Sequence, residues 1–376
     1  MLRSMLLADP AIDAVHRSAG ATEGLASHPG PASSTFSFSP GLIDRLACLD
    51  VAMAFTSYQA GMLYMLGSQS GHGAQLHQAV VDKPMGLAVG DDGALVMAGD
   101  TAITRYRNAL RPNQRVGDVF DACFMPRQTW LTGALDAHDV GIDAAGRILF
   151  VNTAFNCIAT LSPVHSFAEV WRPRFISALV DEDRCHLNGL AMDRGAPVAV
   201  TACSRSDTID GWRDRRSGGG VVIDVASGEI ICAGLSMPHS PRAHQGLLWL
   251  LNSGTGELGF IAENERFEPA AFCPGFVRGL TFQGNLAFVG LSKPRYRRFE
   301  GLPLDRRLQD ADSDPWCGIQ VIDLENGACV DWFRIDGPVT EIYDVALIPG
   351  HRCPMSVSPG SPDAGRLVTI ADQSNA

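Results

Sequence analysis

A two-strand unit recurs six times along this 376-residue chain, and in every copy the two strands meet at a glycine turn. The units start at residues 85, 138, 188, 239, 278 and 343, and their turns lie at Gly93, Gly146, Gly195, Gly246, Gly284 and Gly350. Successive starts are 53, 50, 51, 39 and 65 residues apart. These intervals bracket the roughly 40–50 residues of a four-stranded propeller blade, so the repeat predicts an all-β propeller.

Two copies also show the outer strand pair that a four-stranded blade needs. These pairs are Gly219–Asp224 with Glu229–Gly234, and Gly318–Asp323 with Ala328–Arg334. Six copies predict a six-bladed β-propeller. Early strands around Val51–Thr56 and Met62–Leu66 would complete the sixth blade and close the ring. A seven-bladed ring would result if those early strands formed a unit of their own.

The first part of the chain differs in composition from the rest. Residues 1–40 are rich in Ala, Ser, Gly and Pro without sustained periodicity, which predicts a loosely ordered N-terminal arm. Residues 41–376 are then expected to form a single propeller domain. Few helices are expected, and the candidates are Leu42–Leu49 and Phe175–Glu182.

Composition excludes several classes of partner. A formal net charge of −11 argues against nucleic acid, because phosphate binding needs a basic surface. No run reaches about 18 uninterrupted apolar residues, so we expect no membrane span and no membrane partner. The first ten residues are too interrupted for the apolar region of a signal peptide. The ten cysteines include no C-x-x-C pair, which favours a reduced, cytoplasmic protein. The sequence does not indicate an oligomeric state.

Histidines recur where the inner strands are expected to start. His138, His186 and His239 each stand just before an apolar run that leads to a turn glycine. The first residues of the inner strands gather at one mouth of a propeller channel, so these imidazoles should converge. Imidazole binds Zn²⁺, Fe²⁺ and Cu²⁺, and three ligands leave one coordination position open. We therefore predict one divalent transition metal ion of unspecified identity, held by these histidines.

Four further residues at the same strand starts are candidates for catalysis, namely Asn188, Arg278, Glu341 and Tyr343. Glu341 would serve as a fourth metal ligand or as a general base. Arg278 would bind an anionic substrate group through paired hydrogen bonds. Asn188 would orient the ligands or the substrate.

Two long insertions, Ser204–Gly218 and Lys293–Trp316, are expected to fold over the same mouth. These loops and one repeat start supply the candidates for substrate binding, which are Arg205, Asp207, Trp212, Arg213, Arg242, Lys293 and Arg295. The predicted function is a metal-dependent hydrolase, lyase or redox enzyme that acts on a small or peptidic anionic substrate.

Two simpler interpretations stand beside the enzyme. Each histidine could instead hydrogen-bond a neighbouring loop and stabilise the ring. The whole protein could be a non-catalytic propeller that docks a protein or peptide through aromatic and arginine side chains on the loops. The residues for that surface would be Trp212, Arg213, Tyr296, Phe299 and Trp316.

Several segments are long enough to carry a family resemblance, namely Thr56–Gly61, Cys185–Gly189, Leu235–Arg242, Asn252–Leu258 and Gly290–Lys293. Over about residues 45–355 the chain resembles a bacterial family of conserved proteins without an assigned function, which implies a propeller and supplies no reaction. It is more loosely similar to six-bladed calcium-dependent lactonases, which place Glu, Asn and Asp around a metal. Asn188 and Glu341 would correspond to part of that set, while histidines at the other places favour a softer metal than calcium. Three histidines on a propeller also resemble zinc-dependent lyases that act on modified peptides.

Overall fold

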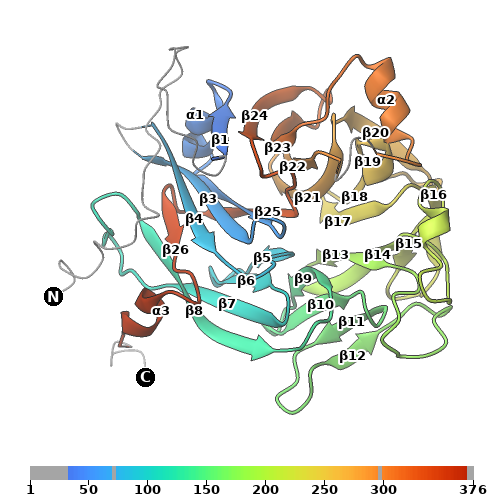
Figure 1. Ribbon diagram of the computed structural model, residues 1–376, viewed down its shortest axis with the longest axis horizontal. Helices are drawn as coiled ribbons and strands as arrows, with labels where there is room; N and C mark the ends of the chain where they lie inside the picture. Colours follow the sequence, from blue (N-terminus) through green and yellow to red (C-terminus); the bar gives the residue numbers. More distant parts are fainter. Residues whose placement is uncertain (1–32, 70–72, 295–298, 371–376) are drawn as a thin grey trace.

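The computed structural model describes residues 33–69, 73–294 and 299–370. Its strands form six small sheets arranged in a ring (Figure 1). Each sheet contributes one strand to the centre of the ring, and these inner strands are β25, β5, β9, β13, β17 and β21. The protein is therefore an all-β, six-bladed propeller, as the repeat predicts.

Three blades are contiguous in sequence, and each has four antiparallel strands that follow one another from the centre outwards. Blade 3 contains β9 (Ala137–Ile142), β10 (Ile148–Asn152), β11 (Cys157–Thr160) and β12 (Ala168–Trp171). Blade 4 contains β13 (Leu187–Asp193), β14 (Ala196–Ala202), β15 (Gly220–Asp224) and β16 (Ile230–Leu235). Blade 5 contains β17 (Pro238–His244), β18 (Leu247–Asn252), β19 (Glu257–Ile261) and β20 (Phe267–Phe272).

The other three blades combine distant parts of the chain. Blade 1 contains β25 (Asp344–Pro349), β2 (Val51–Ser57), β3 (Met62–Gln69) and β4 (Gly73–Val80). Blade 2 contains β5 (Leu87–Val89), β6 (Leu95–Ala98), β7 (Ala102–Asn108), β8 (Ala122–Leu131) and, parallel to β8, β26 (Pro354–Ser356). Blade 6 contains β21 (Phe276–Gln283), β22 (Leu286–Ser292), β23 (Cys317–Asp323), β24 (Cys329–Asp336) and β1 (Thr35–Phe38).

Blade 1 closes the ring. Its inner strand β25 pairs antiparallel with β2, from Val51 opposite Pro349 to Thr56 opposite Asp344. The early strands thus complete the sixth blade, and the seven-bladed alternative is wrong because β2 to β4 share a sheet with β25. Most of the expected arm over residues 1–40 lies outside the described residues. Its described end, Thr35–Phe38, pairs with β24 as strand β1.

Short helices lie outside the sheets, and one predicted helix is absent. Helix α1 (Leu42–Cys48) matches its prediction, while α2 (Leu304–Asp310) and α3 (Pro362–Arg366) lie in a long loop and near the C-terminus. Single 3-10 turns, η1 (Arg213–Arg215) and η2 (Ser253–Thr255), also occur. The helix predicted at Phe175–Glu182 is wrong. That segment links β12 to β13, buries Ile176 between the blades, and turns the Ser177 amide toward the Asp207 carboxylate rather than a helical carbonyl.

Hydroxyl groups form hydrogen bonds between neighbouring blades near the channel mouth. Thr153 Oγ1 donates a hydrogen bond to the Leu187 carbonyl at 2.6 Å, and Ser253 Oγ donates to the Val277 carbonyl at 2.6 Å. In each case the hydroxyl lies just after the second strand of one blade and the carbonyl lies at the start of the next inner strand. These bonds fix the starts of β13 and β21 against the preceding blades.

Arg242 on β17 connects most of the inner strands. Its guanidinium makes two hydrogen bonds to the Asp139 carboxylate of blade 3, at 2.8 and 3.2 Å. It also donates to the carbonyls of Leu190 in blade 4 and Leu280 in blade 6, each at 3.1 Å, and lies 3.7 Å from the Asp344 carboxylate of blade 1. One side chain thus bridges the inner strands of five blades.

Within the described part of the chain, no helix is long and apolar enough to cross a membrane. All ten cysteines lie in that part and are free thiols. Burial raises the pKa of several of these thiols, to about 12 for Cys157 and Cys203, so they are poor nucleophiles at neutral pH.

Candidate functional site

At or just before the start of each inner strand, two side chains that are two residues apart face the channel mouth. The strand registers show that Asp136, His186 and Met237 occupy one position in blades 3 to 5, and that His138, Asn188 and His239 occupy the next. We call these positions the upper and lower rings. The upper ring consists of Lys83, Asp136, His186, Met237, Phe276 and Glu341. The lower ring consists of Met85, His138, Asn188, His239, Arg278 and Tyr343.

The two-ring arrangement corrects one sequence inference. The three histidines were expected at equivalent positions, but His186 belongs to the upper ring and Asn188 takes the place equivalent to His138 and His239. The backbone agrees with the placement of His186 in the upper ring, because His186 has φ +52° and the upper-ring residue Asp136 has φ +51°. Lys83 and Met237 share this left-handed conformation, so it occurs before the inner strands of blades 2 to 5. Such a conformation is uncommon outside glycine and clusters at functional sites.

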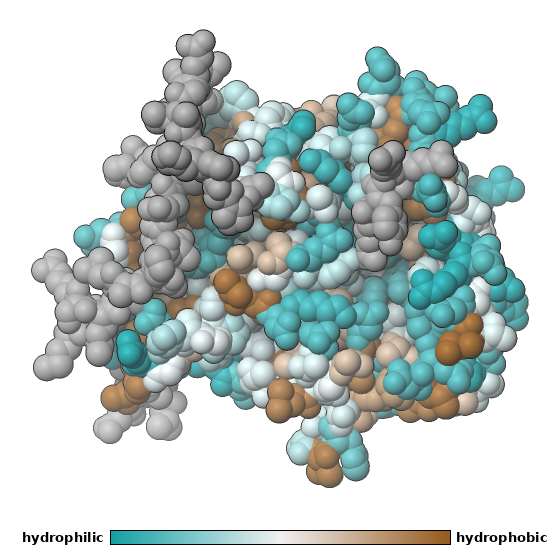
Figure 2. Space-filling model, viewed as in Figure 1, coloured by the Kyte–Doolittle hydropathy of each residue, from teal (hydrophilic) through white to brown (hydrophobic). Residues whose placement is uncertain are grey.

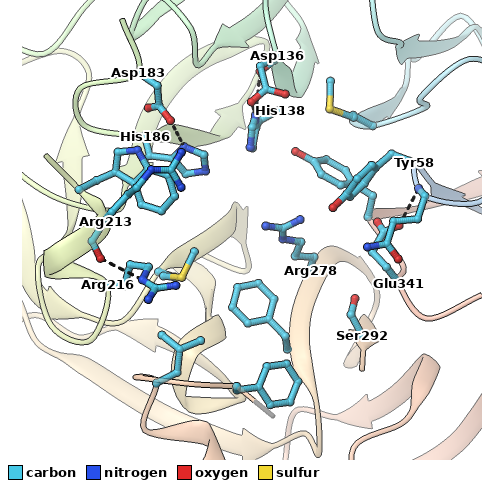
Figure 3. Close-up of a pocket in the computed structure, with 18 of the residues that line it drawn as sticks. Tyr58, Asp136, His138, Asp183, His186, Arg213, Arg216, Arg278, Ser292 and Glu341 are labelled. Atoms are coloured by element: carbon cyan, nitrogen blue, oxygen red, sulfur yellow. Dashed lines mark hydrogen bonds and ion pairs between the residues drawn. The ribbon is translucent and has the colours of Figure 1, made fainter. Parts of the chain in front are cut away.

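The upper ring opens into a pocket of about 720 Å³ at the channel mouth. Figure 3 shows the Arg278 guanidinium near its middle, with His138, His186, Glu341 and Ser292 around it. The two predicted insertions lie over this mouth and contribute Trp212 and Lys293, among others, to the lining. The structure therefore brings His138, His186, Arg278, Glu341 and Tyr343 into one pocket.

Below this pocket is a second, much smaller space of about 10 Å³, enough for one water-sized group. The lower-ring side chains Asn188, His239, Arg278 and Tyr343 border it. His239 Nε2, Tyr343 Oη and Arg278 Nε are buried there without a hydrogen-bond partner among the described residues. Buried polar atoms normally have partners, so these three atoms indicate a place for a ligand atom or a water. We call this space the lower chamber.

Hydrogen bonds determine which nitrogen of His138 and His239 carries the proton. His138 Nδ1 lies 2.8 Å from the Asp136 carbonyl and 2.8 Å from Thr153 Oγ1. The carbonyl can only accept, and the Thr153 proton goes to Leu187, so Nδ1 must be the donor. His239 repeats this pattern with the Met237 carbonyl and Ser253 Oγ, at 2.8 and 2.9 Å. In both imidazoles Nε2 is therefore an acceptor.

Burial keeps these two imidazoles neutral. Desolvation lowers the pKa of His138 to about 4, although the Asp136 carboxylate partly opposes the shift. Desolvation and then the Arg278 charge hold the pKa of His239 well below its usual value. Tyr343 keeps its proton, because burial raises its pKa well above the ordinary value despite the Arg278 charge. At neutral pH the lower chamber thus has the Tyr343 hydroxyl, the Arg278 cation and two neutral imidazoles at its border. The other groups that border it are Asn188, Ser240 and the carboxyl groups of Asp139 and Asp344.

The Arg278 side chain differs from the other cations of the pocket in having neither an ion pair nor a hydrogen bond among the described residues. Lys83 lies 3.4 Å from Asp136 and Arg213 lies 2.7 Å from Asp210. In the described part of the chain, the Arg278 side chain makes no ion pair and no hydrogen bond, and its guanidinium carbon lies 5.1 Å from the Phe276 ring and 5.2 Å from the Tyr343 ring. A half-buried guanidinium of this kind is suited to bind an anionic group from a ligand.

His186 has the features of an oriented base. Its Nδ1 lies 2.7 Å from Asp183 Oδ2, and its ring stacks on Trp212 with centroids 4.1 Å apart. The carboxylate holds the proton on Nδ1 and leaves Nε2 basic on the ring that lines the pocket. The His138 ring is 4.9 Å away, edge to face.

The arrangement does not fit the predicted three-histidine metal centre. Across residues 33–69, 73–294 and 299–370, no group of three or more His, Cys, Asp or Glu side chains is placed to hold a metal ion. His138 and His239 present acceptor nitrogens, but the third histidine belongs to the other ring, and the Arg278 cation lies at the same chamber. The transition-metal cofactor stays a prediction.

The other predicted residues have separate places. Glu341 lines the pocket and accepts hydrogen bonds from Ser57 Oγ at 3.1 Å and the Gln59 amide at 3.3 Å. Trp212, Arg213 and Lys293 also line the pocket.

Three substrate-binding candidates lie elsewhere, and one cannot be placed. Arg205 is exposed and is not part of the lining, and Asp207 pairs with Arg184 at 2.7 Å. Arg242 lies further along β17 than the residues of the upper and lower rings, and its guanidinium forms an ion pair with Asp139. Arg295 lies outside the described residues.

Sequence reasoning missed Asp183, Asp136 and Tyr58. Asp183 precedes His186 by three residues, and this spacing across a turn is the signal that could have identified it as the partner of the histidine. Asp136 lies in the turn just before the inner strand β9, and Tyr58 follows β2, the second strand of blade 1. Neither residue is part of a sequence motif.

The fold and this site define a class of protein, a six-bladed propeller with a polar pocket over the channel mouth. Residues 40–357 match the family described as "Domain of unknown function (DUF4915)", and the chain belongs to that family. A comparison with curated proteins finds no match.

Solved structures with a similar fold include proteins of different kinds. One, from a nidogen/laminin complex, is 13% identical with a TM-score of 0.49, and the match covers 80% of this chain and 99% of that one. Virginiamycin B lyase from Staphylococcus aureus, solved in catalytically inactive form with quinupristin, is 11% identical with a TM-score of 0.40, covering 81% and 99%. A gluconolactonase from Xanthomonas campestris is 17% identical with a TM-score of 0.38, covering 64% and 82%.

Proposed function

We propose that this protein is an enzyme that binds a small anionic substrate in the channel-mouth pocket and carries out hydrolase- or lyase-type acid–base chemistry on it. The observation that supports this most is the guanidinium of Arg278, which has no ion-pair partner among the described residues and lies among imidazole, phenol and carboxylate groups. A charge kept in such a half-buried place is costly unless a ligand supplies the anion.

The neighbouring groups supply complementary roles. His186, oriented by Asp183, takes a proton from the substrate or from a bound water through Nε2. Arg278 and the Tyr343 hydroxyl, which belong to residues that border the lower chamber, stabilise negative charge that develops on a substrate oxygen. His138 and His239 accept hydrogen bonds and fix the orientation of that group. Hydrolysis and elimination both require such a base and such an oxyanion site.

A protein-docking propeller is less well supported. The loop aromatics Trp212 and Phe299 are only 7% and 8% exposed, so they do not form an accessible hot-spot surface. Tyr296 lies outside the described residues. On the face drawn in Figure 2, hydrophobic residues occur in separate small groups rather than in one continuous patch.

The test is to incubate purified protein with a metabolite extract and to follow consumed and formed compounds by mass spectrometry. We expect turnover by the parent to fall at least a hundredfold in His186→Gln and in Arg278→Met, because each removes a group that acts in the transition state. His244→Gln, which removes a half-buried histidine at the far end of β17 and outside the pocket, should react as the parent does.

Metal analysis of the same samples distinguishes a metal-dependent enzyme from one that works without a metal ion. One equivalent of zinc, iron or copper that is lost in His138→Gln would support a metal-dependent enzyme. Identical compound profiles for the parent and for both site variants would contradict enzyme function and favour the docking propeller.

A further inference from the structure

We infer that the ligand of this pocket is a carboxylic acid whose apolar body packs against one wall, while its carboxylate binds Arg278. This inference rests on the proposed function and specifies its substrate class. Three observations carry it, namely an apolar wall, the position of Arg278 beside that wall, and the distribution of charge around the pocket.

One side of the pocket is apolar. Its residues are Trp212, Met237, Phe276, Phe299 and Leu302, which come from the starts of β17 and β21 and from the two long loops. They belong to two adjoining hydrophobic clusters that share Phe276 and Leu302. The remaining lining, from Asp136 and His138 to Tyr58 and Glu341, is polar apart from Met85 (Figure 3). A ligand that fills the pocket therefore meets two chemically different sides.

The apolar wall is anchored before any ligand binds. The rings of Phe276 and Phe299 stack with centroids 6.3 Å apart. Phe299 packs on Leu304 and Leu308 of helix α2, and Arg307 of the same helix pairs with Glu257 of blade 5. A preformed wall needs little ordering on binding, so an apolar group that covers it retains most of its hydrophobic gain.

The anion site adjoins this wall directly. The guanidinium carbon of Arg278 lies 5.1 Å from the Phe276 ring, which is itself part of the wall. A carboxylate bound to the N–H edge of Arg278 would thus place its substituent within van der Waals reach of Phe276. The pocket volume of about 720 Å³ lies within the range typical of drug-sized ligands.

The surrounding charge favours a carboxylate over a phosphate ester. Four carboxylates, those of Asp136, Asp183, Glu300 and Glu341, line the same pocket. Five cations also line it, namely Lys83, Arg213, Arg216, Arg278 and Lys293. Lys83, Arg213 and Lys293 have carboxylate partners, and Arg216 donates a hydrogen bond to the Arg213 carbonyl, so Arg278 is the lining cation whose side chain has neither kind of partner among the described residues. A phosphate monoester carries nearly two negative charges at neutral pH and would be repelled by the carboxylates, whereas a monoanion needs only Arg278.

Isothermal titration calorimetry at pH 7.5 with four small probes tests this inference. The probes are 3-phenylpropionate, propionate, 3-phenylpropanamide and phenyl phosphate. We expect 3-phenylpropionate to bind at least tenfold more tightly than propionate, and the uncharged amide and the phosphate ester to bind more weakly than 3-phenylpropionate by a similar factor. Arg278→Met should abolish binding of both acids. Phe276→Leu should reduce the ratio between the two acids, while Phe282→Leu, at the far end of the same strand, should leave it unchanged.

The outcomes separate this inference from the proposed function. Equal affinity for 3-phenylpropionate and propionate, with both lost in Arg278→Met, would overturn the apolar-acid inference and leave an anion-binding pocket. Tighter binding of phenyl phosphate than of 3-phenylpropionate would overturn the choice of carboxylate. Binding of the acids that survives Arg278→Met, or no binding of any anion by folded parent protein, would overturn the inference together with the anion-binding part of the proposed function.

Discussion

Arg242→Met is expected to lower the free energy of unfolding by about 3–5 kcal/mol, which is typical when one partner of a buried ion pair is removed. The substitution leaves the Asp139 carboxylate, whose side chain is 4% exposed, without its paired hydrogen bonds. It also removes the bonds from β17 to the Leu190 and Leu280 carbonyls of the neighbouring blades. The loss should be measured by urea unfolding. It should be larger at pH 8 than at pH 5, because burial raises the pKa of Asp344 to about 7 and Arg242 opposes that rise, so Arg242 stabilises the ionised Asp344 carboxylate above pH 7.

Two further variants serve as a control and as a compensating change for Arg242→Met. Arg147→Met removes an arginine that also pairs with an aspartate, Asp143, but its side chain is 62% exposed, so a change below about 1 kcal/mol is expected. Adding Asp139→Asn to Arg242→Met should recover part of the loss, because the uncompensated charge is then gone. A loss below about 1 kcal/mol for Arg242→Met would mean that the contacts between inner strands do not depend on this side chain.

Acid should destabilise the protein through its buried neutral histidines. The pKa of His138 is lowered to about 4 by burial, whereas an unfolded histidine titrates near 6.5. Between these values the unfolded chain binds a proton that the folded chain does not, so the stability falls as the pH falls. Each pH unit in this window corresponds to about 1.4 kcal/mol for His138, or about 3 kcal/mol in all. His239 adds to the loss, since its pKa is also lowered.

The His138→Gln variant isolates this effect from opposing groups. Burial raises the pKa of Asp344 to about 7, which gives the opposite slope, because the folded chain then holds the extra proton as the pH falls. That contribution is common to parent and variant, so the difference between their unfolding free energies in urea should narrow steadily from pH 7 to pH 4.5. His244→Gln serves as the control, and a parallel pair of curves for parent and His138→Gln would refute the assignment of His138 as a buried neutral group.

Much of the fold was predictable because each copy of the repeat has the same chemistry. Each copy combines an apolar run, a turn glycine and a second run, and the turn glycines Gly93, Gly146, Gly195 and Gly246 all have positive φ. That pattern identifies hairpins from sequence, and their spacing gives the blades. The pairing of β2 with β25 followed from counting strands, since one blade lacked its outer strands near the C-terminus and the chain had spare strands near residue 51.

The site was predictable in location and less so in detail. Spacing placed His186 with His138 and His239, but a two-residue shift changes which ring a side chain joins, and only the strand register reveals it. Arg242 was predicted to bind substrate. Its observed partner, Asp139, is 103 residues away in the sequence, and the two residues meet only because β9 and β17 both lie at the centre of the propeller. The expected helix at Phe175–Glu182 failed because tertiary burial of Ile176 overrode local propensity.

The way blade 1 is built makes ring closure a late event in folding. Its strand β2 pairs Val51 with Pro349 of β25, close to the two ends of the described chain, and contacts between residues so distant in sequence form slowly. Glu341 and Tyr343 immediately precede β25 and complete both rings of the site. Five formed blades would still lack these two side chains, so ligand binding at the channel mouth should arise only with the slowest, ring-closing step of folding.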